Sequence, residues 1–227
     1  MYLSRAWLGL VLLTSLFGLG SSSLLAAEEG RILKVAPVTR HAENWNYLAV
    51  TEMVFRYYGL PSASSVETYQ CGIASLFMRG RDATTCASAC LQCEVASGTS
   101  TDLETTLQQY PRRVSAARGV ATPDLVAIDR PLALSPPALL TQLNANKPVV
   151  ALLTNGRPVL IVGYRSGPEL FVLLNDPEPE SHTFYADAGA QPGPTAGGWW
   201  LAYSALRTTL GWSRTITVAA ARGLDAN

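Results

Sequence analysis

Residues 45–59 read Trp45-Asn46-Tyr47-Leu48-Ala49-Val50-Thr51-Glu52-Met53-Val54-Phe55-Arg56-Tyr57-Tyr58-Gly59. Apolar side chains recur in this stretch at helical spacing, which places most of them on buried faces: Leu48, Val50, Met53, Val54 and Tyr57. Asn44 stands just before the stretch and belongs to the residue types that cap helices. Glycine and proline in Gly59-Leu60-Pro61 end the pattern. The sequence therefore predicts a core helix from Trp45 to Tyr58.

Three more helices are predicted after this one, at Val66–Phe77, Asp102–Tyr110 and Ala138–Asn144. Short apolar and β-branched runs then follow, at Pro148–Leu153, Val159–Tyr164 and Leu170–Leu174. Glycine-containing turns separate these runs, which indicates an antiparallel meander. Outlying strands are predicted at Ile32–Val38 and Ile216–Ala220, and a glycine- and proline-rich loop at Ala186–Gly198 precedes an apolar segment at Trp199–Leu206. Helices first and strands second is the order of an α+β fold.

The composition of the chain argues against several classes of function. Its 227 residues carry 17 basic and 17 acidic side chains, so the clustered basic excess of a nucleic-acid-binding protein is missing. Apolar residues make up 48% of the chain and charged residues 15%, which is unlike a disordered protein. With two histidines, a histidine-built metal site is not expected. The sequence predicts no nucleic-acid partner, no metal and no cofactor.

The first 27 residues have the layout of a secretory signal peptide. Arg5 supplies the positive start, residues 6–19 are apolar, and small residues lead to Ala26-Ala27. The alternative is an uncleaved membrane anchor, but the apolar run is shorter than the roughly 20 residues that a spanning helix needs. We expect cleavage after Ala27 and an exported chain, periplasmic or extracellular, with no membrane span left after cleavage.

All four cysteines lie close together, at Cys71, Cys86, Cys90 and Cys93. In an oxidising compartment an even, clustered set predicts two disulfides, whose connectivity the sequence leaves open among three possibilities. The alternative is a zinc site, because Cys90 and Cys93 have the two-residue gap that zinc ligands often use. Cys71 and Cys86 do not form the second such pair, so disulfides are favoured.

Five pieces of the chain, taken in order, resemble papain-like cysteine peptidases, in particular the branch that includes the bacteriocin-processing peptidases. They are residues 45–59, Gln70-Cys71-Gly72-Ile73-Ala74, Asn146-Lys147-Pro148-Val149-Val150, the strand from Gly156 to Tyr164, and Asn175-Asp176-Pro177. The resemblance implies a papain-like α+β fold in which a helical, disulfide-bridged half packs on an antiparallel-sheet half beside a cleft. It implies a single domain over 28–227, with the helical half at about 28–145 and the sheet half at about 146–227.

The chain departs from this family at the residues that carry catalysis. Counted along the resemblance, the nucleophilic cysteine position holds Asn46, the oxyanion-hole glutamine position Arg40, and the general-base histidine position Arg157. The orienting position is retained as Asp176 or Asn175. An asparagine amide is not a nucleophile near neutral pH, and arginine keeps its proton too firmly to act as a base. We therefore expect a non-catalytic, papain-like protein rather than an enzyme.

Two alternatives concern what these substitutions do. An active peptidase or thiol transferase with a rearranged catalytic set would need a free thiolate from one of the four cysteines near His41 or His182. Separately, Arg40 and Arg157 beside a helix start would attract an anion such as a peptide carboxylate. The structural alternative is a salt bridge between Arg157 and Asp176, because a buried arginine almost always pairs with a carboxylate.

The expected function is binding of a peptide or protein through the former substrate cleft. Candidate contact residues are those near the helix start and an aromatic pair late in the chain: His41, Trp45, Tyr47, Trp199 and Trp200. Aromatic side chains of this kind line binding grooves, although Trp199 and Trp200 also lie within an apolar pattern typical of a core.

Overall fold

The computed structural model describes residues 29–64, 68–77, 90, 98–178 and 182–221. The signal peptide predicted at 1–27 lies outside these residues. The helices are α1 (Asn46–Tyr57), α2 (Tyr69–Phe77), α4 (Ser100–Arg118), α5 (Pro136–Asn144), α6 (His182–Asp187) and α7 (Tyr203–Thr208). The strands are β1 (Gly30–Ile32), β2 (Leu125–Pro131), β3 (Val149–Leu153), β4 (Pro158–Ser166), β5 (Leu170–Asn175), β6 (Gln191–Pro192), β7 (Gly198–Ala202) and β8 (Trp212–Ala220).

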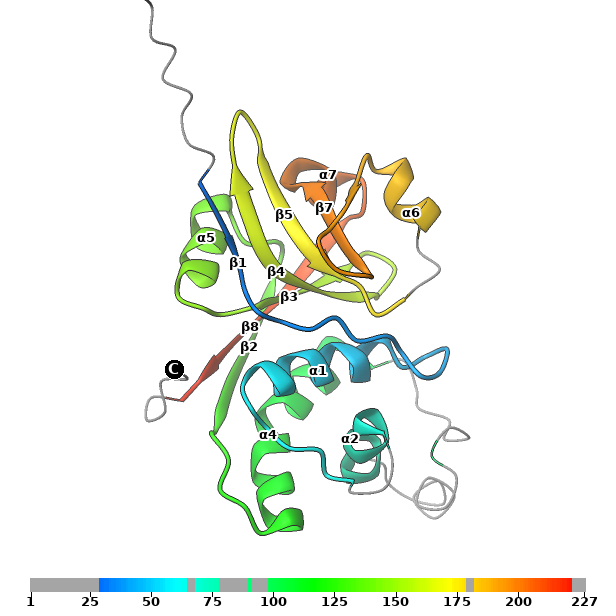
Figure 1. The fold of residues 1–227 in the computed structure, drawn as a ribbon, viewed down its shortest axis with the longest axis vertical. Coiled ribbons are helices and arrows are strands. Elements are labelled where there is room, and N and C mark those ends of the chain that lie inside the picture. Colours follow the sequence, from blue (N-terminus) through cyan, green and yellow to red (C-terminus); the bar gives the residue numbers. More distant parts are fainter. Residues whose placement is uncertain (1–28, 65–67, 78–89, 91–97, 179–181, 222–227) are drawn as a thin grey trace, which may run out of the picture.

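The strands form one antiparallel sheet in the order β2-β8-β3-β4-β5-β7-β6, with β1 paired to the far end of β4. Figure 1 shows α1, α2 and α4 gathered below the sheet, while α5, α6 and α7 lie beside its upper part. The segment after β1 runs between the sheet and α1. The predicted α+β fold, with a helical part against an antiparallel sheet, is confirmed.

Helix α1 lies between the other helices and the sheet, because its side chains are apolar on more than one face. All residues from Leu48 to Phe55 are buried, and the ring of Phe55 stacks on Tyr110 of α4 at 4.1 Å between centroids. The predicted cap at Asn44 is wrong: the residue before the first turn is Trp45, whose side chain makes no capping hydrogen bond. The first backbone N–H groups of α1 therefore donate no hydrogen bond to the side chain at the cap position.

Helix α4 is longer than the predicted 102–110. Thr99 caps it in a reciprocal pair with Asp102, and Gly119 ends it in the left-handed conformation at φ 64°. Pro111 lies inside this helix, where the pattern was expected to stop. Buried residues at helical spacing carry the helix past the proline: Leu103, Leu107, Tyr110 and Val114. This packing outweighs the backbone hydrogen bond that proline cannot make.

Two strands of the sheet come from the range 28–145, the expected helical half, in which one strand was predicted, at Ile32–Val38. β2 pairs with β8, and β1 pairs with residues 163–165 of β4. The strand predicted at Ile32–Val38 is limited to Gly30–Ile32, because the chain then turns away after the contact from Leu33 N–H to the Val162 carbonyl, 2.8 Å. None of the helices in the described parts of the chain is long and apolar enough to cross a membrane.

Candidate functional site

A cleft of about 270 Å³ opens at the amino end of α1, between that helix and the turn that joins β3 to β4. It is lined by Arg40, Glu43, Asn44, Asn46, Tyr47, Gly98, Asn155, Gly156, Arg157, Pro158 and Glu178. The three positions predicted to replace glutamine, cysteine and histidine therefore come together in one cleft. A larger hollow of about 560 Å³ between α4 and β2 contains none of the predicted site residues. We take the smaller cleft as the candidate site because it contains the three predicted positions, Arg40, Asn46 and Arg157.

Arg157 is placed in the cleft by the tight turn before β4. Gly156 takes the left-handed conformation at φ 78°, and the backbone N–H of Arg157 donates to Asn155 Oδ1 at 3.0 Å. The guanidinium binds two carboxylates, Asp176 through Nη2 and Glu178 through Nη1, the latter at 2.6 Å. It also lies over the ring of Phe184, 5.2 Å from the centroid. The salt bridge expected as the structural alternative is present.

Asp176 follows β5 and is the residue that faces Arg157. Its carboxylate accepts hydrogen bonds from the Tyr185 hydroxyl at 2.6 Å and from the Glu178 backbone N–H at 2.8 Å. Burial raises the pKa of Asp176, although the charge of Arg157 acts in the opposite direction. Asn175 is also buried, but its amide donates to the Val35 carbonyl at 3.2 Å. Of the two candidates for the orienting position, Asp176 is thus the one that contacts Arg157, while Asn175 holds the chain after β1 in place.

Arg40 is held on the other side of Glu178. Its Nη2 lies 2.8 Å from the Glu178 carboxylate, and its Nη1 donates to the Glu43 carbonyl at 2.6 Å. Its backbone N–H donates to the Pro177 carbonyl at 2.8 Å. Glu178 therefore joins the segment before α1 to the sheet. Because both arginines already bind carboxylates, the arrangement does not favour the anion site that was the other alternative.

Asn46 and Tyr47 form the helix side of the cleft. The Oδ1 atom of Asn46 and the Nε atom of Arg157 are buried and have no hydrogen-bond partner among the described residues. Burial and the charge of Asp102 raise the pKa of Tyr47 to about 12. A Cβ at Gly98 would stand 2.8 Å from Cγ of the Tyr47 ring, so glycine permits this close approach. Trp45, in contrast, is buried in the core and does not line the cleft.

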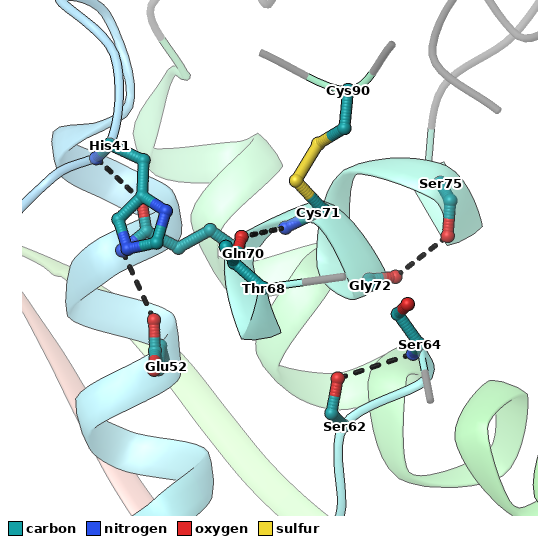
Figure 2. Close-up of a disulfide and its surroundings, with 10 residues drawn as sticks. All are labelled: His41, Glu52, Ser62, Ser64, Thr68, Gln70, Cys71, Gly72, Ser75 and Cys90. Carbon is teal, nitrogen blue, oxygen red and sulfur yellow. Dashed lines mark hydrogen bonds between the residues drawn. A yellow bond between two sulfur atoms is a disulfide. The ribbon is translucent and has the colours of Figure 1, made fainter. Parts of the chain in front are cut away.

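His41 follows the cleft-lining Arg40 in the sequence but belongs to a different cluster, shown in Figure 2. Its backbone N–H donates to Gln70 Oε1 at 3.0 Å, and its ring points toward Glu52. The buried Gln70 also donates to the Thr39 carbonyl at 2.9 Å and to Glu52 at 3.1 Å. Gln70 thus ties the segment that carries Arg40 to α1 and α2.

The disulfide next to this cluster joins Cys71 of α2 to Cys90, with their Cα atoms 5.6 Å apart. This bridge confirms one disulfide and removes both cysteines from any thiolate zinc site. Cys86 and Cys93 lie outside the described residues. Within the described parts of the chain, no group of three His, Cys, Asp or Glu side chains is arranged to hold a metal ion.

The aromatic residues late in the chain do not form the wall of the cleft. Trp199 instead stacks on Tyr185, the hydroxyl partner of Asp176, at 5.2 Å between centroids, and the ring of His182 meets the Trp199 ring edge-on at 5.1 Å. Trp200 contacts Arg165, whose guanidinium carbon is 4.9 Å from the ring centroid. None of the three is among the cleft-lining residues.

Sequence reasoning missed Glu178 and Tyr185, the two further residues that organise the site. For Glu178 there was a signal, since a second acidic residue stands two positions after Asp176 and two arginines needed counter-charges. For Tyr185 there was none, because its contact with Asp176 depends on how α6 packs against the sheet.

No known protein family matches the chain, and no curated protein matches it either. Among solved structures, the chain is similar to one described as a double glycine motif protease from an AMS/PCAT transporter in complex with the leader peptide. The TM-score is 0.45 and the identity 11%, over 84% of this chain and 95% of the other. A similarity of this size supports no inference about function, and the α+β class stated above comes from the structure itself.

Proposed function

We propose that this chain is an exported, papain-like protein that binds a peptide or a protein in the cleft at the start of α1 and does not cleave it. The observation that carries the proposal is the pair of substitutions in one cleft, Asn46 at the helix start and Arg157 before β4. The sequence resemblance places the nucleophile and the base at these two positions. An exported chain is proposed from the first 27 residues alone.

The contacts of Arg157 are incompatible with the work of a general base. Its guanidinium is bound to Asp176 and Glu178, and two carboxylates stabilise the protonated form of an arginine that is already protonated at any ordinary pH. Asn46 has no acidic hydrogen that a base would need to remove. These two side chains therefore support a function without hydrolysis.

An active enzyme with a rearranged catalytic set stays the second candidate. The structure reduces the number of cysteines available as its nucleophile, because Cys71 and Cys90 are joined in a disulfide and neither lines the cleft. A thiol nucleophile would have to come from Cys86 or Cys93. The test is hydrolysis of fluorescent casein by the purified protein, with and without reductant. We expect no hydrolysis in either condition. Hydrolysis that Cys86→Ser or Cys93→Ser abolishes would establish the enzyme instead.

The binding function is tested by selecting a displayed library of random peptides on the purified protein. Asn44→Trp places a large ring at the exposed rim of the cleft and should abolish binding of the selected peptides. Thr208→Trp places the same ring at the exposed carboxyl end of α7, outside the cleft, and should leave binding unchanged. Peptides that bind both variants equally, or a selection that yields no binder, would refute the proposal.

A further inference from the structure

The turn between β3 and β4 contains an asparagine followed by a glycine, Asn155-Gly156, and no other asparagine of the sequence precedes a glycine. Because glycine has no Cβ, its backbone nitrogen is the least hindered one that can follow an asparagine. Residues 154–156 are exposed, so water reaches the turn. The pair therefore has both the sequence and the exposure that attack by a backbone nitrogen on the preceding side-chain amide requires.

The side-chain amide of Asn155 is bonded through its oxygen. Its Oδ1 accepts from the Arg157 backbone N–H at 3.0 Å, a contact that polarises the carbonyl and makes Cγ easier to attack. Its Nδ2 has no hydrogen-bond partner among the described residues. The nitrogen that would leave in such a reaction is therefore not held by the protein.

One contact of the turn opposes the reaction in the folded state. The Gly156 N–H donates to the Leu153 carbonyl at 2.9 Å, and the Leu153 N–H donates to the Arg157 carbonyl at 2.9 Å. The Gly156 nitrogen can attack only after the first of these bonds has broken. The reaction therefore needs local opening of the turn, and it should be slower in the folded protein than in the unfolded chain.

We propose that Asn155-Gly156 is a site of spontaneous deamidation that alters the candidate cleft. The Gly156 nitrogen bonds to Cγ of Asn155 and closes a five-membered imide, while the bond from Cγ to Nδ2 breaks. The proton that Gly156 loses passes through water to the departing nitrogen, which leaves as ammonia. Water then opens the imide at either of its carbonyls and gives aspartate or isoaspartate at position 155.

The isoaspartate product affects Arg157 through the backbone. Its main chain runs through the former side chain and is one carbon longer, so the hydrogen bonds that Leu153 makes across the turn no longer fit. Asn155, Gly156 and Arg157 all line the cleft, and from this turn the Arg157 guanidinium reaches its two carboxylates. Isoaspartate should therefore weaken these ion pairs. Aspartate, with an unchanged backbone, keeps an oxygen that accepts from the Arg157 N–H.

The site is tested by incubating the purified protein at mildly alkaline pH, folded in buffer and unfolded in urea, and digesting both samples with pepsin in acid. Mass spectrometry measures the conversion of each asparagine. Asn44 is the internal control, because it is exposed but precedes the bulky Trp45. We expect conversion at Asn155 and not at Asn44, faster in urea than in buffer. Equal conversion of both residues, or an intact Asn155 in the folded sample once the urea sample has converted completely, would overturn the proposal.

Variants separate the modification from its effect on the cleft. Asn155→Gln should lose the isoaspartate signal, measured with an isoaspartate-specific methyltransferase, because its longer side chain would have to close a six-membered ring. Asn155→Asp has the charge of the product without the longer backbone and should melt as the wild type does. Incubated wild type, with its isoaspartate fraction isolated by hydrophobic-interaction chromatography, should melt at a lower temperature. Equal melting temperatures would refute the effect on the cleft, and a signal that persists in Asn155→Gln would refute the site.

Discussion

At the scale of single residues, Arg157 shows how a buried positive charge is accommodated beside a buried carboxylate. Its guanidinium fills the space beside Asp176 and balances that carboxylate, which is fully buried. A second carboxylate, Glu178, and the face of Phe184 complete its surroundings. A buried ion pair of this kind is costly to break, since removing one partner leaves the other charge without compensation.

Arg157→Ala is therefore expected to lower the free energy of unfolding by about 3–5 kcal/mol. Denaturant titration of the purified protein measures this change. The control is Arg112→Ala, because that side chain is 81% exposed and lies 3.4 Å from Asp124, so its loss should cost less than about 1 kcal/mol. Equal stability of the two variants would contradict a structural role for the buried pair.

Tyr47 makes the free energy of unfolding depend on pH in the alkaline range. Burial and the charge of Asp102 raise its pKa from the ordinary 10.0 to about 12, so the unfolded chain loses this proton before the folded one does. The stability that neutral Tyr47 contributes is fully present below pH 10 and is lost as the pH rises toward the folded pKa of about 12. In Tyr47→Phe the unfolding free energy should fall less steeply across this window, as measured by denaturant titration at several pH values. Parallel curves for the two proteins would exclude this contribution.

At the scale of elements, the disulfide between Cys71 and Cys90 fastens α2 to a part of the chain that follows it by 19 residues. Helix α2 also carries Gln70, which holds the segment of Arg40, so the bridge supports the cleft indirectly. A closed loop of this length limits the unfolded chain and stabilises the folded state by roughly 3 kcal/mol.

We expect the double variant Cys71→Ser/Cys90→Ser to lose about that amount of stability, roughly 3 kcal/mol, in denaturant titration without reductant. Ser75→Ala, in the same helix, changes one hydroxyl that bonds the Gly72 carbonyl at 3.0 Å and should change stability far less. If the double variant unfolds at the wild-type midpoint, the bridge has no stabilising role.

At the scale of the whole molecule, the sheet ends at β2, whose outer edge is covered by side chains of α4. Gln108 donates to the Ala127 carbonyl at 2.7 Å, and Glu104 accepts from the Asp129 N–H at 3.3 Å. Val126 and Ile128 are exposed on the same strand. Uncovered edges with apolar side chains pair readily with other chains, so we expect these α4 side chains to protect the edge from self-association.

Glu104→Ala/Gln108→Ala should uncover this edge and make the protein self-associate as its concentration rises. Sedimentation velocity measures the effect, and Gln109→Ala, next to Gln108 on the same helix, should sediment as the wild type does. A double variant that sediments like the wild type at every concentration would show that the side chains of α4 do not protect the edge.

The sequence predicted those helices and strands whose positions are set by apolar spacing and by turn residues close to them in the chain. The helix at 45–58 and the three strands between 148 and 174 lie within two residues of their positions in the structure, because apolar spacing and turn residues mark both ends. β2 was not predicted, since its partner β8 lies more than 80 residues away. In the site, Arg40, Asn46 and Arg157 were found by position along a resemblance, whereas Tyr185 depends on tertiary packing that no local signal records.

The sharing of Glu178 between Arg40 and Arg157 limits what a single substitution in the cleft could achieve. Histidine in place of Arg157 alone would remove a partner from both Asp176 and Glu178 while position 46 still held an asparagine. A cysteine at position 46 alone would meet an arginine that cannot take its proton. A thiol and a base would therefore have to be introduced together to create an activated nucleophile in this cleft.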